Sequence, residues 1–123
     1  MANIQRISES EMEIMRIIWA HGETITTAEI YKALPRDKKW AQSTVLTFLS
    51  RLCDKGILAT TKKGASNIFT VKVTQSQYLA YETKHFLDTV HGGSPKSFIA
   101  ALLEDEQISH DEIEKLKKWF MDL

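Results

Sequence analysis

The hydrophobic pattern of residues 40–56 predicts a helix, and this helix is the central element of the predicted fold. Val45, Phe48, Leu49 and Leu52 follow the i, i+3, i+4, i+7 spacing of a helix that is packed along one side. The opposite side carries short hydroxyl groups, whereas a solvated helix usually carries long Glu and Lys side chains. Short hydroxyls allow close approach to base edges and phosphates. A half-buried helix with a polar outer face is the alternative, and the flanking segments favour nucleic acid.

Segments of helical and strand periodicity alternate along the first 73 residues. They are, in chain order, a helix at 9–21, an extended piece at 23–25, a helix at 28–34, the helix at 40–56, and strands at 57–61 and 68–73. Ser8 and Glu11 form a capping-box pattern at the start of the first helix. A basic turn at 36–39 precedes the third helix, and a tip at 62–67 joins the strands. This order predicts a winged helix-turn-helix domain over residues 1–73.

After the predicted strands the periodicity is helical again and predicts three further helices. Ser94 and Pro95 begin the second of them, and Ser109 with Glu112 begins the third. Their apolar side chains exceed what three short helices can cover, so we expect a partner, and a second copy of the chain is the simplest one. Residues 74–123 are therefore predicted to form an all-α dimerisation domain. The expected interface residues are Tyr78, Tyr81, Phe86, Val90, Phe98, Leu102, Ile113, Leu116, Trp119 and Phe120.

The outward face of the helix at 40–56 is interpreted as a surface that reads DNA in the major groove. The residues expected to contact bases are Gln42, Ser43, Leu46, Thr47 and Ser50. The residues expected to contact phosphates are Thr44, Arg51, Lys55, Lys62 and Lys63. Leu46 is placed for contact with a thymine methyl group. Lys62 and Lys63 belong to the predicted hairpin tip, which follows the helix as a wing.

Charge is distributed unevenly along the 123 residues, although the net charge is zero. Through residue 73 there are eleven basic and seven acidic residues, and after it five lysines face nine acids. This division favours an N-terminal half that meets a polyanion. The single cysteine excludes an internal disulfide and a multi-cysteine metal site, which fits a cytoplasmic location. No apolar run is long enough to span a bilayer, so we expect no membrane insertion.

The residue types that catalysis or metal binding requires are not grouped in this sequence. The four histidines lie on different predicted elements without cysteine partners, so we expect no metal ion and no other cofactor. Gly92 and Gly93 follow a helix and lack the strand and lysine of a phosphate-binding loop. We therefore expect a protein that is not an enzyme.

Two other functions are compatible with the pattern. One is a winged-helix module that binds proteins and never DNA, which the neutral total charge permits. The other is a one-component regulator that senses a small ligand, with Tyr78, Tyr81 and Phe86 lining the pocket. A steep loss of DNA affinity with rising salt distinguishes DNA binding from a protein-binding module.

A set of residues spread along the whole sequence matches a known family. These residues are Ile7-Ser8, Met15, Ile17 to Trp19, Trp40, Ser43-Thr44, Arg51-Leu52, Lys55-Gly56, Phe86-Leu87, Leu103-Glu104, Ser109 and Glu112 to Glu114. On these positions the chain resembles the penicillinase-repressor family of the BlaI/MecI type. The resemblance implies a bacterial homodimeric transcriptional repressor that binds a palindromic DNA operator. It also implies a pathway in which a membrane sensor metalloprotease causes cleavage in the C-terminal domain, with Ala101–Leu102 as the candidate bond.

Overall fold

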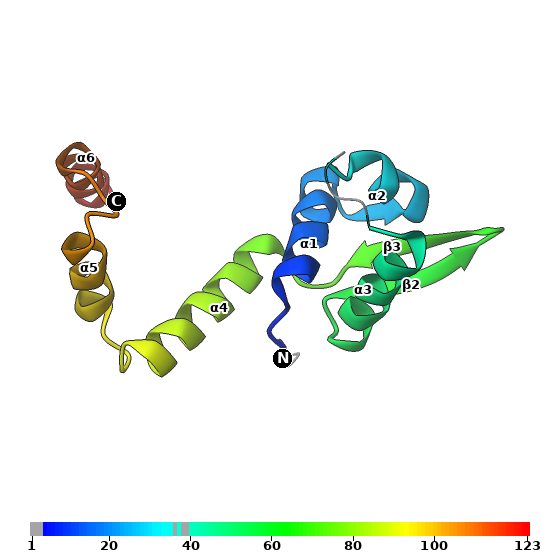
Figure 1. Cartoon of the computed structure of the whole chain (residues 1–123), viewed down its shortest axis with the longest axis horizontal. Coiled ribbons are helices and arrows are strands. Elements are labelled where there is room, and N and C mark those ends of the chain that lie inside the picture. Colours follow the sequence, from blue (N-terminus) through cyan, green and yellow to red (C-terminus); the bar gives the residue numbers. More distant parts are fainter. Residues whose placement is uncertain (1–3, 36, 38–39) are drawn as a thin grey trace. The chain divides into compact units, whose positions relative to one another are not determined.

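The computed structural model of the protein describes residues 4–35, 37 and 40–123, without the side chain of Lys63. Of the predicted basic turn at 36–39, only Asp37 is among the described residues. The chain forms two compact units, Met1–Glu82 and Thr83–Leu123. The first unit contains helices and a sheet, and the elements of the second unit are helices (Figure 1).

The elements of the first unit follow the predicted winged-helix order. They are α1 (Glu9–His21), β1 (Thr24–Thr26), α2 (Thr27–Ala33), α3 (Gln42–Asp54), β2 (Leu58–Lys63), β3 (Ser66–Val71) and the first part of α4 (Gln75–Val90). Ser8 caps α1 in a capping box with Glu11, as predicted, and Thr26 caps α2 in a capping box with Glu29. Gly56, with φ +77°, follows the end of α3 and allows the chain to turn into β2.

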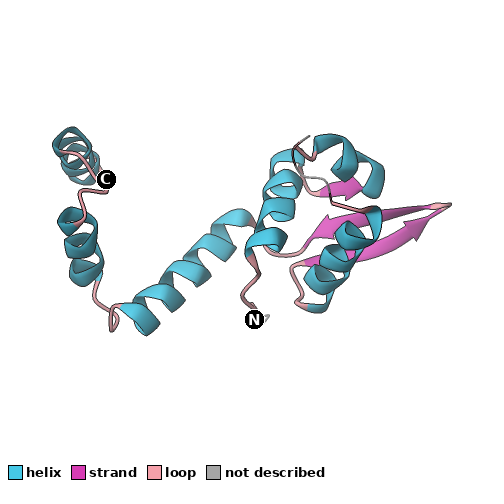
Figure 2. Ribbon diagram, viewed as in Figure 1, coloured by secondary structure: helices cyan, strands magenta, loops and turns pink. Residues whose placement is uncertain are grey.

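The three strands form one antiparallel sheet in the order β1-β3-β2 (Figure 2). Ile25 of β1 lies opposite Phe69 of β3, and both side chains are buried. Leu58 of β2 lies opposite Val71 of β3, and Val71 is two residues after Phe69. The side chains of Leu58, Phe69 and Val71 therefore lie on the same face of the sheet. The fold class predicted from the sequence, mainly α with a small β-hairpin, is confirmed, and β1 is added to the hairpin as a third strand.

We call β2, β3 and the turn between them the wing. The wing extends beyond α3 as a long hairpin (Figure 1). Lys62 pairs with Asn67 and Lys63 pairs with Ser66, so the loop is a two-residue turn in which Gly64 has φ +64°. The predicted tip at 62–67 was too long, because both lysines continue the strand ladder of β2.

The core of the first unit lies between its helices and the inner face of the sheet. The buried apolar residues are Ile7, Ile14, Met15, Ile18, Ile25, Ile30, Val45, Leu49, Leu52, Ile57, Leu58, Phe69, Val73 and Tyr78. Tyr78 comes from the first turn of α4, so α4 begins within the first unit. The compact units consequently divide after Glu82, nine residues later than the boundary drawn from the sequence at residue 73.

The second unit comprises the rest of α4 with α5 (Pro95–Glu104) and α6 (His110–Met121). Ser94 caps α5, and Ser109 forms a capping box with Glu112 at the start of α6, as predicted. Among the helices of the described residues, none is long and apolar enough to cross a membrane.

Candidate nucleic-acid interface

Helix α3 has an inner and an outer face, and both are those predicted from the sequence. Val45, Leu49 and Leu52 are buried, and Phe48 packs against the same core. The outer face, which we call the reading face, consists of Gln42, Ser43, Leu46, Thr47 and Ser50, all of them exposed. This face therefore remains available to a partner while the inner face holds the helix to its domain.

The N-terminal half of α3 is held by aromatic side chains. The hydroxyl of Tyr31, on α2, donates a hydrogen bond to the carbonyl oxygen of Gln42 at 2.8 Å. The ring of Trp40 contacts that of Phe48 edge to face, with ring centres 5.2 Å apart. Ala41 occupies the N-cap position and offers no side-chain acceptor to the first-turn amides. These amides and the positive end of the helix dipole favour an anionic partner at this end of α3.

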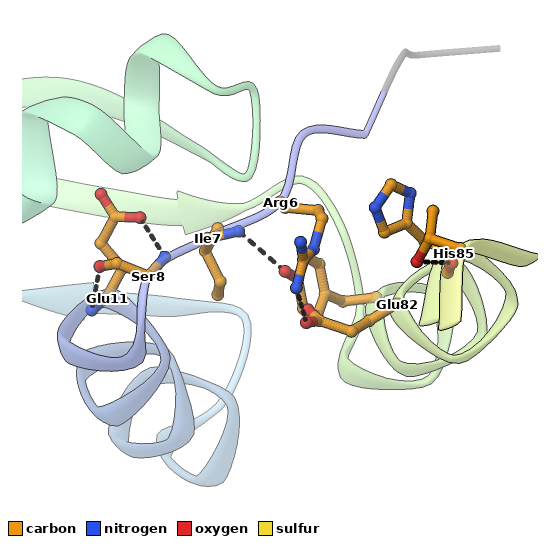
Figure 3. A network of polar contacts seen from close by, with 8 residues as sticks. Arg6, Ile7, Ser8, Glu11, Glu82 and His85 are labelled. Atoms are coloured by element: carbon orange, nitrogen blue, oxygen red, sulfur yellow. Dashed lines mark hydrogen bonds and ion pairs between the residues drawn. The ribbon is translucent and has the colours of Figure 1, made fainter. Parts of the chain in front are cut away.

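The C-terminal end of α3 is held by an ion pair with α1. The Nζ atom of Lys55 lies 2.6 Å from Oε1 of Glu11, whose side chain is only 1% exposed. The same carboxylate accepts a hydrogen bond from the backbone N–H of Ser8 at 2.7 Å (Figure 3). Burial raises the pKa of Glu11, but the hydrogen bonds from Lys55 and Ser8 and the charge of Lys55 outweigh burial and lower it overall. A buried carboxylate thus fixes the C-terminal end of α3 to the domain.

This ion pair revises the set of residues expected to contact phosphates. The ammonium of Lys55 is already paired with a buried carboxylate, so we no longer place it among the phosphate contacts. Arg51, in the last turn of α3, and Lys62, on the wing, are exposed. Thr44 is half-buried beside the reading face. The side chain of Lys63 lies outside the described part of the chain.

Thr47 has an internal hydrogen bond that orients its side chain. Its hydroxyl donates to the carbonyl oxygen of Ser43, one turn earlier in α3, at 2.9 Å. The lone pairs of the Thr47 oxygen remain able to accept a hydrogen bond. A group that donates, such as the exocyclic amine of adenine or cytosine, fits this arrangement.

A hollow of about 550 Å³ lies where α2, the start of α3 and the turn of the wing meet. Its lining consists of Thr27, Ala28, Tyr31, Gln42, Leu46, Ala65, Ser66 and Asn67. The hollow is thus bordered both by Gln42 and Leu46 of the reading face and by residues 65–67 of the wing. Among the described residues, no group of three or more His, Cys, Asp and Glu side chains is placed to hold a metal ion.

Comparison with known sequences assigns this architecture to a family. The sequence profile described as Penicillinase repressor matches residues 7–121. The chain belongs to the penicillinase repressor family. The penicillinase repressor of Bacillus licheniformis is 34% identical over 116 residues, which cover 94% of this chain and 90% of that protein. The methicillin resistance regulatory protein MecI of Staphylococcus aureus (strain N315) is 30% identical over 111 residues, covering 90% of this chain and 89% of that protein.

Two solved structures of the repressor BlaI are similar to this chain. The solution structure of the DNA-binding domain of the repressor BlaI is 37% identical with a TM-score of 0.55, covering 63% of this chain and 94% of that one. The Bacillus licheniformis BlaI monomeric form, in complex with the blaP half-operator, is 37% identical with a TM-score of 0.51 and the same coverage. The resemblance read from the sequence and the winged-helix fold are both confirmed.

The second unit exposes many apolar side chains. Val90 is 61% exposed, Trp119 57% and Phe120 67%. Phe86 and Leu116 are also exposed, whereas the remaining predicted interface residues of this unit, Phe98, Leu102 and Ile113, are half-buried. Exposed apolar surface of this kind is typical of an interaction site. The use of these eight residues in dimerisation stays a prediction.

Tyr78 and Tyr81 belong to the core region of the first unit. Tyr78 is fully buried, its hydroxyl accepts a hydrogen bond from the backbone N–H of Ile7 at 2.8 Å, and its ring lies beside those of Trp19 and Tyr81. Burial is the largest cause that raises the pKa of Tyr78 to about 12, and the hydrogen bond to Glu82 is the next largest. The assignment of Tyr78 to the dimer interface, and to the lining of a ligand pocket, was wrong because this side chain closes the domain core. Tyr81 packs against the same core and is half-buried.

The residues that position α3 were not predicted from the sequence. Glu11 was interpreted only as a capping residue, yet it lies four residues before Met15 and seven before Ile18, on the buried stripe of α1. An acid on a buried stripe indicates a paired carboxylate, so this signal was present in the sequence. The hydrogen bond from Tyr31 to Gln42 depends on how α2 and α3 pack, and spacing alone does not predict it.

Proposed function

We propose that this member of the penicillinase repressor family is a homodimeric transcriptional repressor that binds a palindromic DNA operator. The observation that carries the proposal is the reading face of α3, with exposed hydroxyls outward and Tyr31 and the Glu11–Lys55 pair holding the helix at its two ends. The solved BlaI relative in complex with a half-operator supports the same use of the domain here. The family and the fold are those of DNA-binding repressors and not of enzymes.

Within this proposal the reading face contacts base edges and the surrounding residues contact the backbone. Gln42, Ser43 and Ser50 donate to and accept from bases in the major groove, Thr47 accepts from them, and Leu46 provides an apolar contact. Arg51, Lys62 and Lys63 contact phosphates, and Thr44 contributes a hydroxyl. Phosphate contacts fix the register of the protein on the duplex, and base contacts select its sequence.

Dimerisation is proposed to occur through the second unit. The exposed apolar side chains of α4, α5 and α6 support this, because burying them against a second copy removes apolar area from water. A two-fold symmetric dimer presents two copies of α3 to two half-sites, which explains why a palindromic operator is expected. Both half-sites then contribute to one binding event.

Repression is proposed to end by proteolysis of the Ala101–Leu102 bond through a membrane sensor metalloprotease pathway, as the family resemblance implies. The bond lies within α5, with Ala101 exposed and Leu102 half-buried, so local fraying of the helix must precede the cut. Cleavage separates Leu102 and α6 from the DNA-binding unit and removes much of the proposed dimer contact. Mass spectrometry of the chain from induced cells is expected to find fragment 1–101, and an intact chain after induction would contradict this step.

A selection experiment tests the proposed function. The full chain is incubated with a pool of randomised DNA duplexes, and bound duplexes are sequenced and remeasured at increasing salt. We expect enrichment of a two-fold symmetric sequence whose affinity falls steeply with salt, because each phosphate contact releases counterions. Enrichment of no sequence, with weak binding to all duplexes, would instead favour the protein-binding module.

A further inference from the structure

Leu46 is a large apolar side chain on a face that is otherwise polar. It is 39% exposed and projects among Gln42, Ser43, Thr47 and Ser50. The core of the first unit is formed on the other side of α3 by Val45 and its neighbours, and Leu46 lies outside it. An exposed apolar group on this face is able to make an apolar contact with a bound partner.

Leu46 also forms part of the wall of the hollow between α2, α3 and the wing. None of the eight residues that line the hollow carries a charge. The first amides of α2 do not make it an anion site, because Thr26 already accepts from the N–H of Glu29 and the carboxylate of Glu29 accepts from Thr26. The uncapped first turn of α3, which favours an anion, begins at the lining residue Gln42, but no side chain of the lining carries a positive charge, so a base edge fits this lining better than a phosphate.

The lining combines apolar and amide groups. Leu46, Ala28 and Ala65 supply methyl groups, and Gln42 and Asn67 supply amides that both donate and accept hydrogen bonds. In the major groove, the edge of thymine has the same mixture, since it presents a methyl group at C5 beside the O4 acceptor. The other three bases present no methyl group there.

We propose that the hollow receives the major-groove edge of a thymine, with the C5-methyl group against Leu46. The inference rests on the proposed function and deepens it by naming one base that the reading face selects. Tyr31 acts as a positioning residue, because its hydrogen bond to the Gln42 carbonyl fixes the first turn of α3 against the wall of the hollow. Leu46 then determines specificity through the methyl group alone.

The experiment removes only that methyl group from the DNA. The best duplex from the selection with the full chain is resynthesised with deoxyuridine in place of each thymine, one symmetric pair at a time. Deoxyuridine keeps every hydrogen-bonding group of thymine, so the change in Kd reports the methyl contact. Burial of one methyl group is worth about 0.8 kcal/mol, so we expect about fourfold weaker binding per half-site at one thymine position.

Variants of the chain test whether Leu46 causes the weaker binding to the deoxyuridine duplex, which we call the deoxyuridine penalty. Leu46→Ala is expected to bind the thymine and deoxyuridine duplexes equally, whereas Leu46→Met keeps an apolar side chain and keeps the penalty. Leu79→Ala, a matched change at an exposed leucine of α4, is expected to keep the full penalty. The inference would be overturned if the unsubstituted chain bound every deoxyuridine duplex within twofold of the original, or if Leu46→Ala retained the penalty. Failure of the full chain to select any sequence would instead overturn the proposed function.

Discussion

Thr47 is the residue at which the reading face is most directly tested. Its hydroxyl is oriented by the Ser43 carbonyl and points from the exposed side of α3, away from Val45 and Leu49. Replacing it by alanine removes a hydrogen-bonding group without opening a cavity, so the melting temperature is expected to stay the same. If Thr47 makes a good base contact, operator affinity falls by about 1–3 kcal/mol, or roughly 5- to 150-fold.

Fluorescence anisotropy with the selected duplex measures this loss. Thr83→Ala, at another exposed helical threonine, is the matched control and is expected to bind as the unsubstituted chain does. Operator binding by Thr47→Ala at full strength would show that the reading face is assigned wrongly.

The Glu11–Lys55 pair makes a second prediction at the scale of single residues. Because the pKa of Glu11 is lowered in the fold, the pair stabilises the protein above the pKa of Glu11 in the unfolded chain. That contribution is lost as the pH falls through the lower folded value, where the carboxylate gains a proton. Lys55→Met leaves a buried carboxylate without its cation. It is therefore expected to lower the free energy of unfolding by about 2 kcal/mol at neutral pH.

Urea denaturation at pH 7 and at successively lower pH checks this prediction. In the double-mutant cycle with Glu11→Gln, the coupling energy is expected to be large at pH 7 and to decrease as the pH falls through the lowered pKa of Glu11. A coupling energy near zero at pH 7 would show that the ion pair does not hold α3.

At the scale of elements, the wing is expected to hold the DNA backbone. Lys62 is exposed and lies next to the turn of the hairpin, where Gly64 begins the loop. Lys62→Ala is expected to weaken binding to selected and random duplexes alike. It is also expected to reduce the slope of the logarithm of the binding constant against the logarithm of the salt concentration by about 0.9 for each lost phosphate contact. Lys72→Ala, just after the other end of β3, is the control and is expected to change neither the affinity for DNA nor the salt slope. If Lys62→Ala lost affinity for the selected duplex alone, Lys62 would instead contact a base.

Most elements of the fold were predictable because their signals are local. Capping patterns at Ser8, Ser94 and Ser109 set helix starts, and the apolar stripe of α3 set its inner face. The missed features depend on contacts between distant segments. Tyr78 has the spacing of any apolar helical residue, and only the fold brings it to Ile7, 71 residues earlier in the chain. The extension of β2 as far as Lys63 likewise depends on the pairing of β2 with β3.

At the scale of the whole molecule, the exposed apolar side chains of the second unit predict self-association. Sedimentation equilibrium at micromolar concentration is expected to give a dimer for the full chain. Residues 1–82 contain the complete core of the first unit and are expected to be monomeric. Trp119→Ser combined with Phe120→Ser, at exposed positions of α6, is expected to shift the full chain toward monomer. A monomeric full-length protein would exclude dimerisation through these helices.

The central claim is that two copies of the reading face bind one palindromic operator because the second unit joins them. The most direct test titrates the full chain and residues 1–101 onto the selected palindrome and onto one half-site alone. Joining two contacts raises affinity by roughly 10²–10⁴, so the full chain is expected to bind the palindrome that much more tightly than residues 1–101 do. On the half-site the two proteins are expected to bind alike. Equal affinity of both proteins for the palindrome would contradict the account.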